Sequence, residues 1–590
     1  EAAMNLRTPL LLATILLAVA AVPSSAQQAP AASAERTGFI TEIIDVRVIN
    51  VEVFVTDRSG VPVAGLGPEA FELQVDGKPM PISNFYAEVG GLPRVSVESA
   101  AAPADPSFRP VEEVRDEAAR RSYVVILIDH SRLGGNNRRR AFKALRQALS
   151  RLGREDLVAV VGVEGALKFY SDFLYDRLAI ERILDDAERV PPASGVNDAE
   201  RRRIFGELAR GISGGIQARA SQADELLLQS RIQAYAADEF QRSLSSLRQI
   251  ELVLSTLAGI PGRKSLLYVG EGIPTRPGEG LFVEWRNRFG SGDPAGNLGL
   301  RRTDYNTDYS RTVGRYDLAL QISQLALAAN RAGVTMYAID AEGDHGGYVR
   351  SALTEQGATS ETLTVVNENF REPLESISTA TGGRLLRSSG KLTEQLTNLL
   401  GDFDSFYSLG FTPPADWQPG SDHDIKVRVK GRSLVVRHRD DVAVPAPDER
   451  EAGATVAALR YHTADNPLEM SATPGVVVPR QDGNAALQVT IQVPIGNLEL
   501  LPQDGTHAGS LAIYVSTKDG EGNTSRVQKV PFNLAIPDAV IERARGDSAR
   551  YDLPVVLRPG DLQVAIGLRD NISGRFSAVR LDVYRYSSRL

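Results

Sequence analysis

Cysteine is absent from all 590 residues of the chain. This absence excludes disulfide bonds, thiolate metal ligands and cysteine nucleophiles. Three catalytic or nucleotide-binding signatures are also missing, namely G-x-S-x-G, H-E-x-x-H and G-x-x-x-x-G-K-[ST]. The sequence thus contains no signature of a serine hydrolase of that type, a zinc protease or a P-loop protein, and we expect the protein not to be an enzyme.

An excess of positive charge is missing as well. The chain has 66 Lys and Arg against 74 Asp and Glu, which gives a net charge of −8 and a pI near 5.6. Nucleic acids and anionic membranes attract basic surfaces. This charge balance therefore argues against both as the main partner.

Long apolar runs are restricted to the N-terminal region. Arg7 precedes the apolar stretch Leu10–Val22, and small residues follow it up to Ala26. A positively charged start, a short apolar stretch and a small-residue cleavage site are typical of a secretory signal peptide. The stretch is too short to cross a bilayer as a helix. We therefore predict a signal peptide over residues 1–26 and an exported bacterial protein, periplasmic or extracellular, without a membrane span.

The length predicts roughly three or four domains, because one hydrophobic core does not grow to this size. Residues 40–98 contain short runs with apolar residues at every second position, such as Ile49–Val55, and turn signals such as Asp76-Gly77. This pattern predicts an N-terminal Ig-like β-sandwich. Residues 404–443 predict a β-hairpin extension. Residues 452–590 repeat the alternating pattern and predict a C-terminal β-sandwich of Ig-like size.

Between these segments, residues 120–403 alternate strand and helix patterns. Four apolar runs predict buried strands: Tyr123–Asp129, Leu157–Val163, Ser265–Val269 and Val334–Ile339. Five amphipathic stretches predict helices: Arg138–Leu152, Leu178–Ala187, Asp317–Ala332, Glu375–Thr381 and Leu392–Leu400. Strands that are apolar throughout belong to a sheet covered on both faces. The fold class is therefore α/β plus all-β, with a doubly wound, Rossmann-like central domain.

Residues 198–258 carry helical periodicity and no strand pattern, which predicts a helical insertion in this domain. The insertion either covers and lengthens the domain or forms an arm that binds a partner. Residues 275–316 are rich in Gly, Arg, Asn and Asp. That composition predicts a long exposed loop.

Several motifs resemble, in order and spacing, the VWFA-related exported proteins of acidobacterial type, which contain a von Willebrand factor type A (VWA) domain. The first segment carries VRVINVEVFVTDRSGVPVAGLGPEAFELQVDGKPMPISNF. The central segment carries ILIDHS, PGRKSLLYVGEG, AGVTMYAIDAEG and TGGRLL, and FYSLGFTPP and IKVRVKGRSLVVRHRDDV follow it. The resemblance covers about residues 46–442, and the last sandwich is matched only by its general type.

The resemblance implies a metal-ion-dependent adhesion site, in which a divalent cation is bound by a D-x-S-x-S loop, a Thr and an Asp. Asp129 and Ser131 match the first Asp and Ser, whereas Leu133 stands at the second Ser. Glu271 corresponds best to the final Asp. The segment FLYD at residues 173–176 places Leu174 at the Thr. Two hydroxyl ligands are thus lost, so Mg²⁺ or Mn²⁺ is expected to bind weakly at this degenerate site.

Without an ion, Asp129 is expected to accept hydrogen bonds from its own loop or to pair with an Arg. Other polar clusters are explained by local structure. The sequence DAEGDHGG contains Asp340 and His345 but no second His at ligand spacing, which favours a solvated acidic loop. His423 is expected in a turn, and Asp519 and Asp570 fit turn chemistry. His130 is a candidate acid or base only if a nucleophile lies beside it.

Three functions remain after these exclusions. The leading hypothesis is an exported, non-enzymatic protein that binds a protein partner in the envelope or outside the cell. Its predicted binding surface surrounds Asp129, Ser131, Glu271 and the 275–316 loop. The second is an adhesin with a divergent site for a divalent cation, and the third is an exported hydrolase with an unrecognised site. The sequence identifies neither the partner nor the oligomeric state.

Overall fold

The computed structural model describes a subset of the chain, residues 48–89, 92–98, 122–149, 156–192, 195–213, 222–289, 311–347, 349, 359–387, 392–414, 416–431, 433–444, 447–461, 466–503 and 505–583. Every element below belongs to one compact unit, Asp45–Leu590. The predicted signal peptide lies outside the described residues. No described helix is long and apolar enough to cross a membrane.

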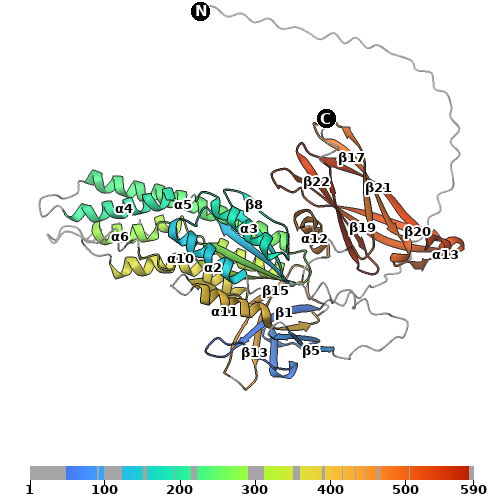
Figure 1. The fold of residues 1–590 in the computed structure, drawn as a ribbon, viewed down its shortest axis with the longest axis horizontal. Coiled ribbons are helices and arrows are strands. Elements are labelled where there is room, and N and C mark those ends of the chain that lie inside the picture. The colour runs from blue at the N-terminus through green and yellow to red at the C-terminus, as the bar shows by residue number, and fades with distance from the viewer. Residues whose placement is uncertain are drawn as a thin grey trace, which may run out of the picture. The chain divides into compact units, whose positions relative to one another are not determined.

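A six-stranded sheet forms the centre of the α/β domain (Figure 1), with the strand order β11-β10-β9-β6-β7-β8. Its strands are β6 (Ser122–Asp129), β7 (Leu157–Val163), β8 (Leu167–Phe169), β9 (Arg263–Gly270), β10 (Val334–Asp340) and β11 (Leu385–Arg387). All neighbouring strands pair in parallel except β8, which is antiparallel to β7. Numbered within the domain, this order is 3-2-1-4-5-6 read from the β8 edge, the doubly wound arrangement that the sequence predicts.

Helices cover both faces of this sheet. The first face packs Val124, Ile126 and Ile128 against helices that include Phe142 and Leu396. These helices are α2 (Gly135–Leu149), α3 (Arg177–Arg189) and α11 (Leu392–Asp404). The second face is covered by α5 (Gln222–Leu257), α8 (Ala319–Ala332) and α10 (Ser360–Ala380). Burial on both faces explains why β7 and most of β6 are apolar at consecutive positions rather than at alternate ones.

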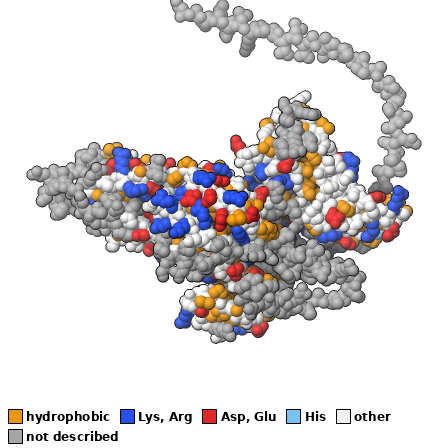
Figure 2. All heavy atoms as spheres, in the orientation of Figure 1, with side chains coloured by type: hydrophobic (Ala, Val, Ile, Leu, Met, Phe, Trp, Pro, Cys, Tyr) orange, Lys and Arg blue, Asp and Glu red, His pale blue; other side chains and the backbone are white. Residues whose placement is uncertain are grey.

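The predicted insertion is confirmed as two helices, α4 (Gly195–Ser213) and α5. With 36 residues, α5 is about 54 Å long. Only part of it packs on the sheet. The rest of α5 lies beside α4 and α6 (Glu279–Phe289), and α10 packs against α6 (Figure 1). These helices surround a separate core that contains Phe205, Trp285 and Phe370. On the face drawn in Figure 2, basic and acidic side chains are intermingled over the helices of the α/β domain.

Two predictions in this region need correction. Residues 279–289 form helix α6 rather than part of an exposed loop, and Leu281, Phe282 and Trp285 are buried. The predicted helix Glu375–Thr381 is only the last part of α10, which begins at Ser360. Both helices bury apolar side chains against the insertion, a tertiary partner that local composition does not show. The segment 290–310 lies outside the described residues.

The N-terminal strands and the strands after the α/β domain form one discontinuous β-sandwich. Its two sheets have the orders β14-β1-β12-β4-β5 and β15-β13-β2-β3. The strands before the α/β domain are β1 (Ile49–Thr56), β2 (Phe71–Val75), β3 (Lys78–Pro79), β4 (Asn84–Val89) and β5 (Leu92–Glu98). Those after it are β12 (Ser405–Phe411), β13 (Asp422–Val429), β14 (Val435–His438) and β15 (Asp441–Ala443). The predicted separation into a sandwich at 40–98 and a hairpin extension at 404–443 is therefore wrong, because β12 pairs with both β1 and β4.

A second β-sandwich follows, with the two sheets β16-β17-β21 and β18-β19-β22-β23, to which β20 adds by pairing with β19. The strands are β16 (Ser471–Pro479), β17 (Ala485–Pro494), β18 (Leu501–Gln503), β19 (Thr506–Asp519), β20 (Gln528–Pro537), β21 (Ser548–Leu557), β22 (Asp561–Asp570) and β23 (Phe576–Asp582), with the short helix α13 (Ile541–Ala544). Both sheets contribute to one core. The segment begins with a helix that we did not predict, α12 (Pro447–Tyr461), whose Pro447 and acidic first turn are signals for a helix start.

A glycine after α10 tests the packing of the sheet. A Cβ added at Gly383 would lie 1.8 Å from the backbone oxygen of Met336 in β10. We expect Gly383→Ala to lower the free energy of unfolding by more than about 2 kcal/mol, because backbone atoms cannot yield as a flexible side chain does. Urea denaturation measures this change. Gly401→Ala in α11 is the control, because nothing lies within 4 Å of a Cβ added there. An equal loss of stability in the two variants would contradict the close packing of Gly383 against β10.

Candidate functional site at the carboxyl ends of the strands

The carboxyl ends of the central strands lie at one edge of the sheet. The strand register pairs Asp129 with Val163 and Asp340 with Gly270. From β6 the sheet extends through β7 to β8 on one side, and from β9 through β10 to β11 on the other, so the strand order switches direction between β6 and β9. Open α/β sheets bind ligands beyond the carboxyl ends of the strands at such a switch point. Asp129 is the last residue of β6 and Glu271 directly follows β9, so the topology brings these predicted site residues to this edge.

Both carboxylate oxygens of Asp129 are occupied by protein donors. Oδ1 accepts the hydroxyl of Ser131 and the backbone N–H of the same residue at 3.1 Å. Oδ2 accepts the hydroxyl of Ser246 at 2.9 Å and that of Tyr268 at 3.0 Å. Asp129 has no exposed surface. The carboxylate therefore ties its own loop to β9 and to α5.

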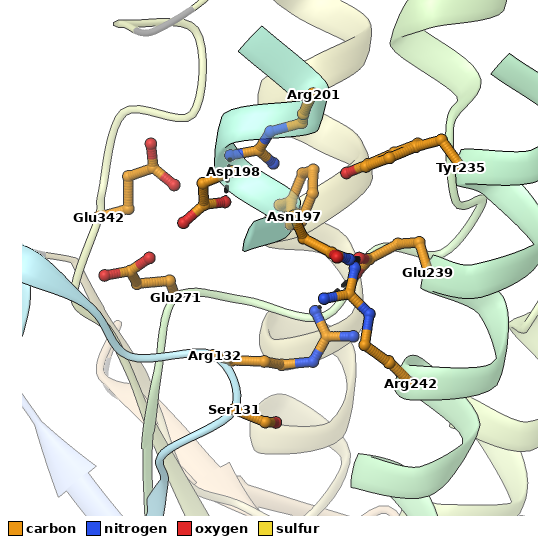
Figure 3. A pocket seen from close by; sticks show the side chains of 11 residues that line it. Ser131, Arg132, Asn197, Asp198, Arg201, Tyr235, Glu239, Arg242, Glu271 and Glu342 are labelled. Atoms are coloured by element: carbon orange, nitrogen blue, oxygen red, sulfur yellow. Dashed lines mark hydrogen bonds and ion pairs between the residues drawn. The ribbon is translucent and has the colours of Figure 1, made fainter. Parts of the chain in front are cut away.

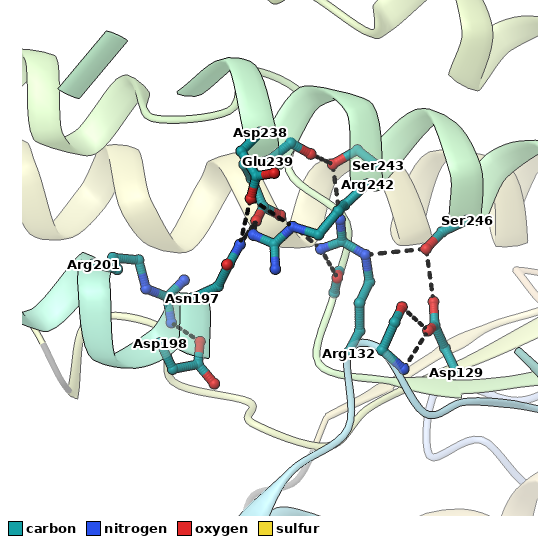
Figure 4. Close-up of polar contacts among 12 residues, drawn as sticks. Asp129, Arg132, Asn197, Asp198, Arg201, Asp238, Glu239, Arg242, Ser243 and Ser246 are labelled. Carbon is teal, nitrogen blue, oxygen red and sulfur yellow. Dashed lines mark hydrogen bonds and ion pairs between the residues drawn. The ribbon is translucent and has the colours of Figure 1, made fainter. Parts of the chain in front are cut away.

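The guanidinium of Arg132 lies beside this carboxylate and connects the same loop to α5 (Figure 4). It donates to Glu239 at 2.9 Å, Ser243 at 2.8 Å and Ser246 at 3.2 Å. It also contacts the backbone oxygen of Gly272 at 3.3 Å. Burial alone would lower the pKa of Arg132, but the charge of Glu239 offsets this and holds it above its ordinary value. The buried cation at this edge is thus an arginine side chain.

This arrangement does not fit a divalent cation. Mg²⁺ and Mn²⁺ require several free oxygen ligands, and both oxygens of Asp129 already accept hydrogen bonds. Leu133 has no exposed surface and packs in the core below α2. Among the described residues, no three His, Asp or Glu side chains are grouped closely enough to hold a metal ion. The expectation that Asp129 bonds to its own loop matches this geometry.

The predicted position of Leu174 is wrong. Leu174 pairs with Val158 near the start of β7, and Val158 precedes Val163 at the carboxyl end by five residues. At about 3.3 Å per residue, these positions are about 17 Å apart along the strand. The segment FLYD thus lies toward the opposite edge of the sheet, where Asp176 caps α3. Residues at the start of α4 take the place expected for FLYD.

A small pocket, partly open to solvent, lies between this loop and the helical insertion (Figure 3); the volume open to the centre of a water molecule is about 30 Å³. Its lining residues are mostly charged or polar and come from six parts of the α/β domain, namely the segments after β6, β9 and β10 and the helices α4, α5 and α10: Ser131, Arg132, Asn197, Asp198, Arg201, Tyr235, Glu239, Arg242, Glu271, Glu342 and Phe370. Of the predicted site residues, Ser131 and Glu271 line the pocket. Asp129 lies beneath it and supports the loop.

Three carboxylates share one side of this pocket, those of Asp198, Glu271 and Glu342 (Figure 3). Burial raises the pKa of Glu271 to about 7, and the charges of Glu342 and Asp198 add to the rise. Burial also raises the pKa of Asp198, although Arg201 opposes the shift. Glu271 accepts one hydrogen bond from the backbone N–H of Gly134 at 3.0 Å. The side of the pocket is therefore a region of repulsion between acidic groups.

His130 is buried and has no nucleophile among its hydrogen-bond partners. Its Nδ1 lies 2.9 Å from Arg138 and its Nε2 lies 3.0 Å from the hydroxyl of Tyr170. Because Arg138 can only donate, Nδ1 accepts and the neutral ring carries its hydrogen on Nε2. Burial, together with the charge of Arg138, lowers the pKa of His130 to about 4. These contacts give His130 a role in packing.

The prediction of a solvated acidic loop at the end of β10 is wrong. Asp340 and His345 are each only 1% exposed. His345 lies 3.0 Å from Asp340 through Nε2 and 2.9 Å from Glu342 through Nδ1. Its ring stacks on Phe370 with the centroids 4.6 Å apart. Burial would lower the pKa of His345, but the hydrogen bond to Asp340 and the two carboxylate charges raise it to about 9. This buried ion pair holds Glu342 at the rim of the pocket.

The remaining candidates from the sequence lie elsewhere. His423 belongs to strand β13, so the prediction that it lies in a turn is wrong. Asp519 accepts backbone N–H groups of Glu521 and Asn523, and Asp570 accepts those of Ile572 and Ser573. The turn chemistry expected for both aspartates is confirmed.

Most of the pocket residues were not predicted from the sequence, because they belong to the insertion. Asn197, Asp198 and Arg201 lie in the first turns of α4, and Glu239 and Arg242 lie in α5. A weak signal existed, since these polar residues interrupt the apolar periodicity of the insertion. Which polar residue faces the strand ends depends on how the two helices pack against the sheet.

The fold and site define a doubly wound α/β domain inserted in one β-sandwich and followed by another, with a polar pocket at the switch point. No family model matches the chain, and no curated protein matches it. Similar solved structures include an aerotolerance-related membrane protein from Bacteroides fragilis, at 7% identity and a TM-score of 0.22, covering 47% of this chain and 98% of that one. Another is a von Willebrand factor type A protein from Catenulispora acidiphila, at 11% identity and a TM-score of 0.22, covering 78% and 66%. None of these likenesses is close enough to support an inference about function.

The contact between Arg132 and α5 can be tested by removing the guanidinium. We expect Arg132→Met to lower the free energy of unfolding by about 1.5–3 kcal/mol, because the buried Glu239 would lose a charged hydrogen bond and keep Arg242 as its remaining ion-pair partner. Hydrogen exchange should increase in α5 around Ser243 more than in β6. Adding Glu239→Gln should restore part of the loss.

The control for this change is Arg139→Met on the exposed side of α2, which should alter stability by less than about 0.5 kcal/mol. Denaturant unfolding of the wild type, Arg132→Met, Glu239→Gln and the double variant completes a double-mutant cycle. A loss in Arg132→Met no larger than in the control, or no gain from the second change, would show that α5 is held by its apolar contacts alone.

The two buried histidines predict opposite dependences of stability on pH. The pKa of His345 is raised to about 9, so its contribution, on the order of 3 kcal/mol, is complete below pH 6.5 and is lost as the pH rises through 9. The pKa of His130 is lowered to about 4, so stability is lost as the pH falls from 6.5 toward 4. Because Glu271 and Lys264 also titrate in this range, each limb is measured between pH 4 and 9.5 as the difference in unfolding free energy between the wild type and the histidine variant. His345→Gln should remove the loss of unfolding free energy toward high pH, and His130→Gln the loss toward low pH. If neither variant changes the dependence of unfolding free energy on pH, the two histidines do not cause it.

Proposed function

We propose that this protein is an exported interaction protein, whose α/β domain binds a protein partner in the periplasm or outside the cell. The domain acts by binding, without catalysis and without a divalent cation. A relationship to VWA-domain proteins, as the sequence motifs suggest, agrees with the doubly wound strand order. The export signal rests on the sequence alone.

One observation carries the proposal, the open pocket at the switch point with Arg132 fixed in its floor. The polar and charged groups that line it come from the strand ends and from both helices of the insertion. The insertion therefore helps to build the binding surface as well as to cover the domain. This position agrees with the binding surface predicted around Ser131 and Glu271.

The chemistry of the pocket favours a basic side chain of the partner. Asp198, Glu271 and Glu342 face one side of the pocket, yet they are not grouped closely enough to hold a metal ion. A guanidinium or an ammonium group is larger than a metal ion and carries several donors that can reach separate carboxylates. Burial, with a smaller contribution from the charges of Glu342 and Asp198, raises the pKa of Glu271, and a positive charge beside it would favour its ionised form.

Calorimetry with a minimal probe tests this function. We expect N-acetyl-arginine methylamide to bind the full chain at least tenfold more tightly than the matching citrulline derivative, which has the same shape without the charge. Glu271→Gln should weaken the binding at least fivefold. Asp186→Asn, at an exposed site on α3, is the control and should leave it unchanged. Equal binding of the two compounds, or no effect of Glu271→Gln, would exclude recognition of a basic side chain in this pocket.

The same method tests the second candidate, an adhesin that depends on a divalent cation. Titration with MgCl₂ or MnCl₂ should give no saturable heat, because the oxygens of Asp129 are already occupied. A saturable heat that disappears in Asp129→Ala would establish the cation-dependent function instead.

A further inference from the structure

Three side chains of the first β-sandwich form a hydrogen-bonded chain that the proposed function does not use. The hydroxyl of Ser421 lies 2.7 Å from Nε2 of His423. Nδ1 of His423 lies 2.8 Å from Oδ2 of Asp76. Ser421 directly precedes β13, His423 lies within it, and Asp76 lies in the turn between β2 and β3. The order of groups is that of a nucleophile, a base and an orienting carboxylate.

The imidazole of His423 is held in one orientation. The other oxygen of Asp76 accepts the backbone N–H of Asp424 at 3.0 Å, which fixes the carboxylate. The indole of Trp417 stacks on the imidazole, with the centroids 3.5 Å apart and the planes 7° apart. Since an ionised carboxylate only accepts, Nδ1 carries a hydrogen, and in the neutral ring Nε2 remains an acceptor directed at Ser421.

The hydroxyl hydrogen of Ser421 has a choice of two acceptors. Besides His423, the backbone oxygen of Gln418 lies 2.7 Å from the hydroxyl. That oxygen also accepts the backbone N–H of Ser421 at 3.1 Å. If the hydroxyl turns toward His423, the oxygen of Gln418 therefore keeps a donor, so the rotation leaves no buried group without a partner.

We propose that Ser421 is a nucleophile activated by His423 as general base, with Asp76 as the positioning residue. The hydroxyl oxygen of Ser421 attacks the carbonyl carbon of an ester while its proton moves to Nε2 of His423. The carbon–oxygen bond to the alcohol breaks, and His423 returns the proton to the departing alkoxide. Water then attacks the acyl-serine while its proton moves to Nε2 of His423. The bond between the acyl carbon and the Ser421 oxygen breaks, His423 returns the proton to that oxygen, and the acid is released.

The surroundings of Ser421 restrict the substrates to small, activated esters. The backbone N–H groups of Gly420 and Ser421 donate to the oxygens of Val444 and Gln418, so neither is free to stabilise an oxyanion. The loss of one such donor typically slows acyl transfer by about 10²–10³. Reaction with a good leaving group is therefore expected, with slow turnover.

Labelling of the full chain with a fluorophosphonate probe, followed by peptide mass spectrometry, tests the nucleophile. The expected result is an adduct on Ser421 that disappears in Ser421→Ala. Asp76→Asn should slow labelling at least tenfold, because the amide no longer fixes the hydrogen on Nδ1. Asn suits the positive φ of 49° at this position. Ser433→Ala is the matched control, since that hydroxyl in the same sandwich contacts Arg58 instead of a histidine.

Hydrolysis of p-nitrophenyl acetate by the same proteins gives a second readout. A folded wild-type chain without an adduct on Ser421 would overturn the proposal. So would labelling and hydrolysis that stay unchanged in Ser421→Ala. If Asp76→Asn fails to fold, as judged by circular dichroism, the site of the adduct in the wild-type chain still decides whether Ser421 is the nucleophile.

Discussion

The buried contact between Arg132 and helix α5 organises the edge of the sheet on which the proposed function depends. The guanidinium reaches Glu239, Ser243 and Ser246 from the loop after β6, and Ser246 in turn reaches Asp129. Because this network uses both the buried positive charge and the oxygens of Asp129, it excludes a divalent cation and fastens the insertion over the strand ends. The pocket exists because the helices are held there.

The same edge shows how buried charge is distributed in this domain. Arg132 and Glu239 neutralise each other where water is excluded, and His345 pairs with Asp340 and Glu342 in a similar way. On the acidic side of the pocket, Glu342 pairs with His345 and Asp198 with Arg201, whereas burial, together with the charges of Glu342 and Asp198, raises the pKa of Glu271 to about 7. An imbalance of this kind costs stability, and proteins tolerate it mainly where a ligand or partner relieves it.

Much of the fold follows from patterns in the sequence. The runs that end at Asp129 and Val163 are apolar at every position, because helices cover both faces of their sheet. The insertion shows a plain helical period. The candidate site was only partly predictable. Ser131 and Glu271 could be found because they directly follow strands, whereas Glu239 could not, since its place depends on how α5 packs. Leu174 was misplaced because the antiparallel strand β8 returns the chain to the opposite edge.

By itself, the sequence determined the type and approximate limits of most strands and helices, since apolar periodicity reports which faces are buried. It also determined that Leu133 cannot bind a metal ion, since its side chain has no polar atom. Only the tertiary structure decided that β12 joins β1 and β4 in one sandwich, because strand pairing between segments more than 300 residues apart leaves no local pattern. It also decided that an arginine is the buried cation beside Asp129, because that depends on the close approach of a loop and a helix separated by more than 100 residues.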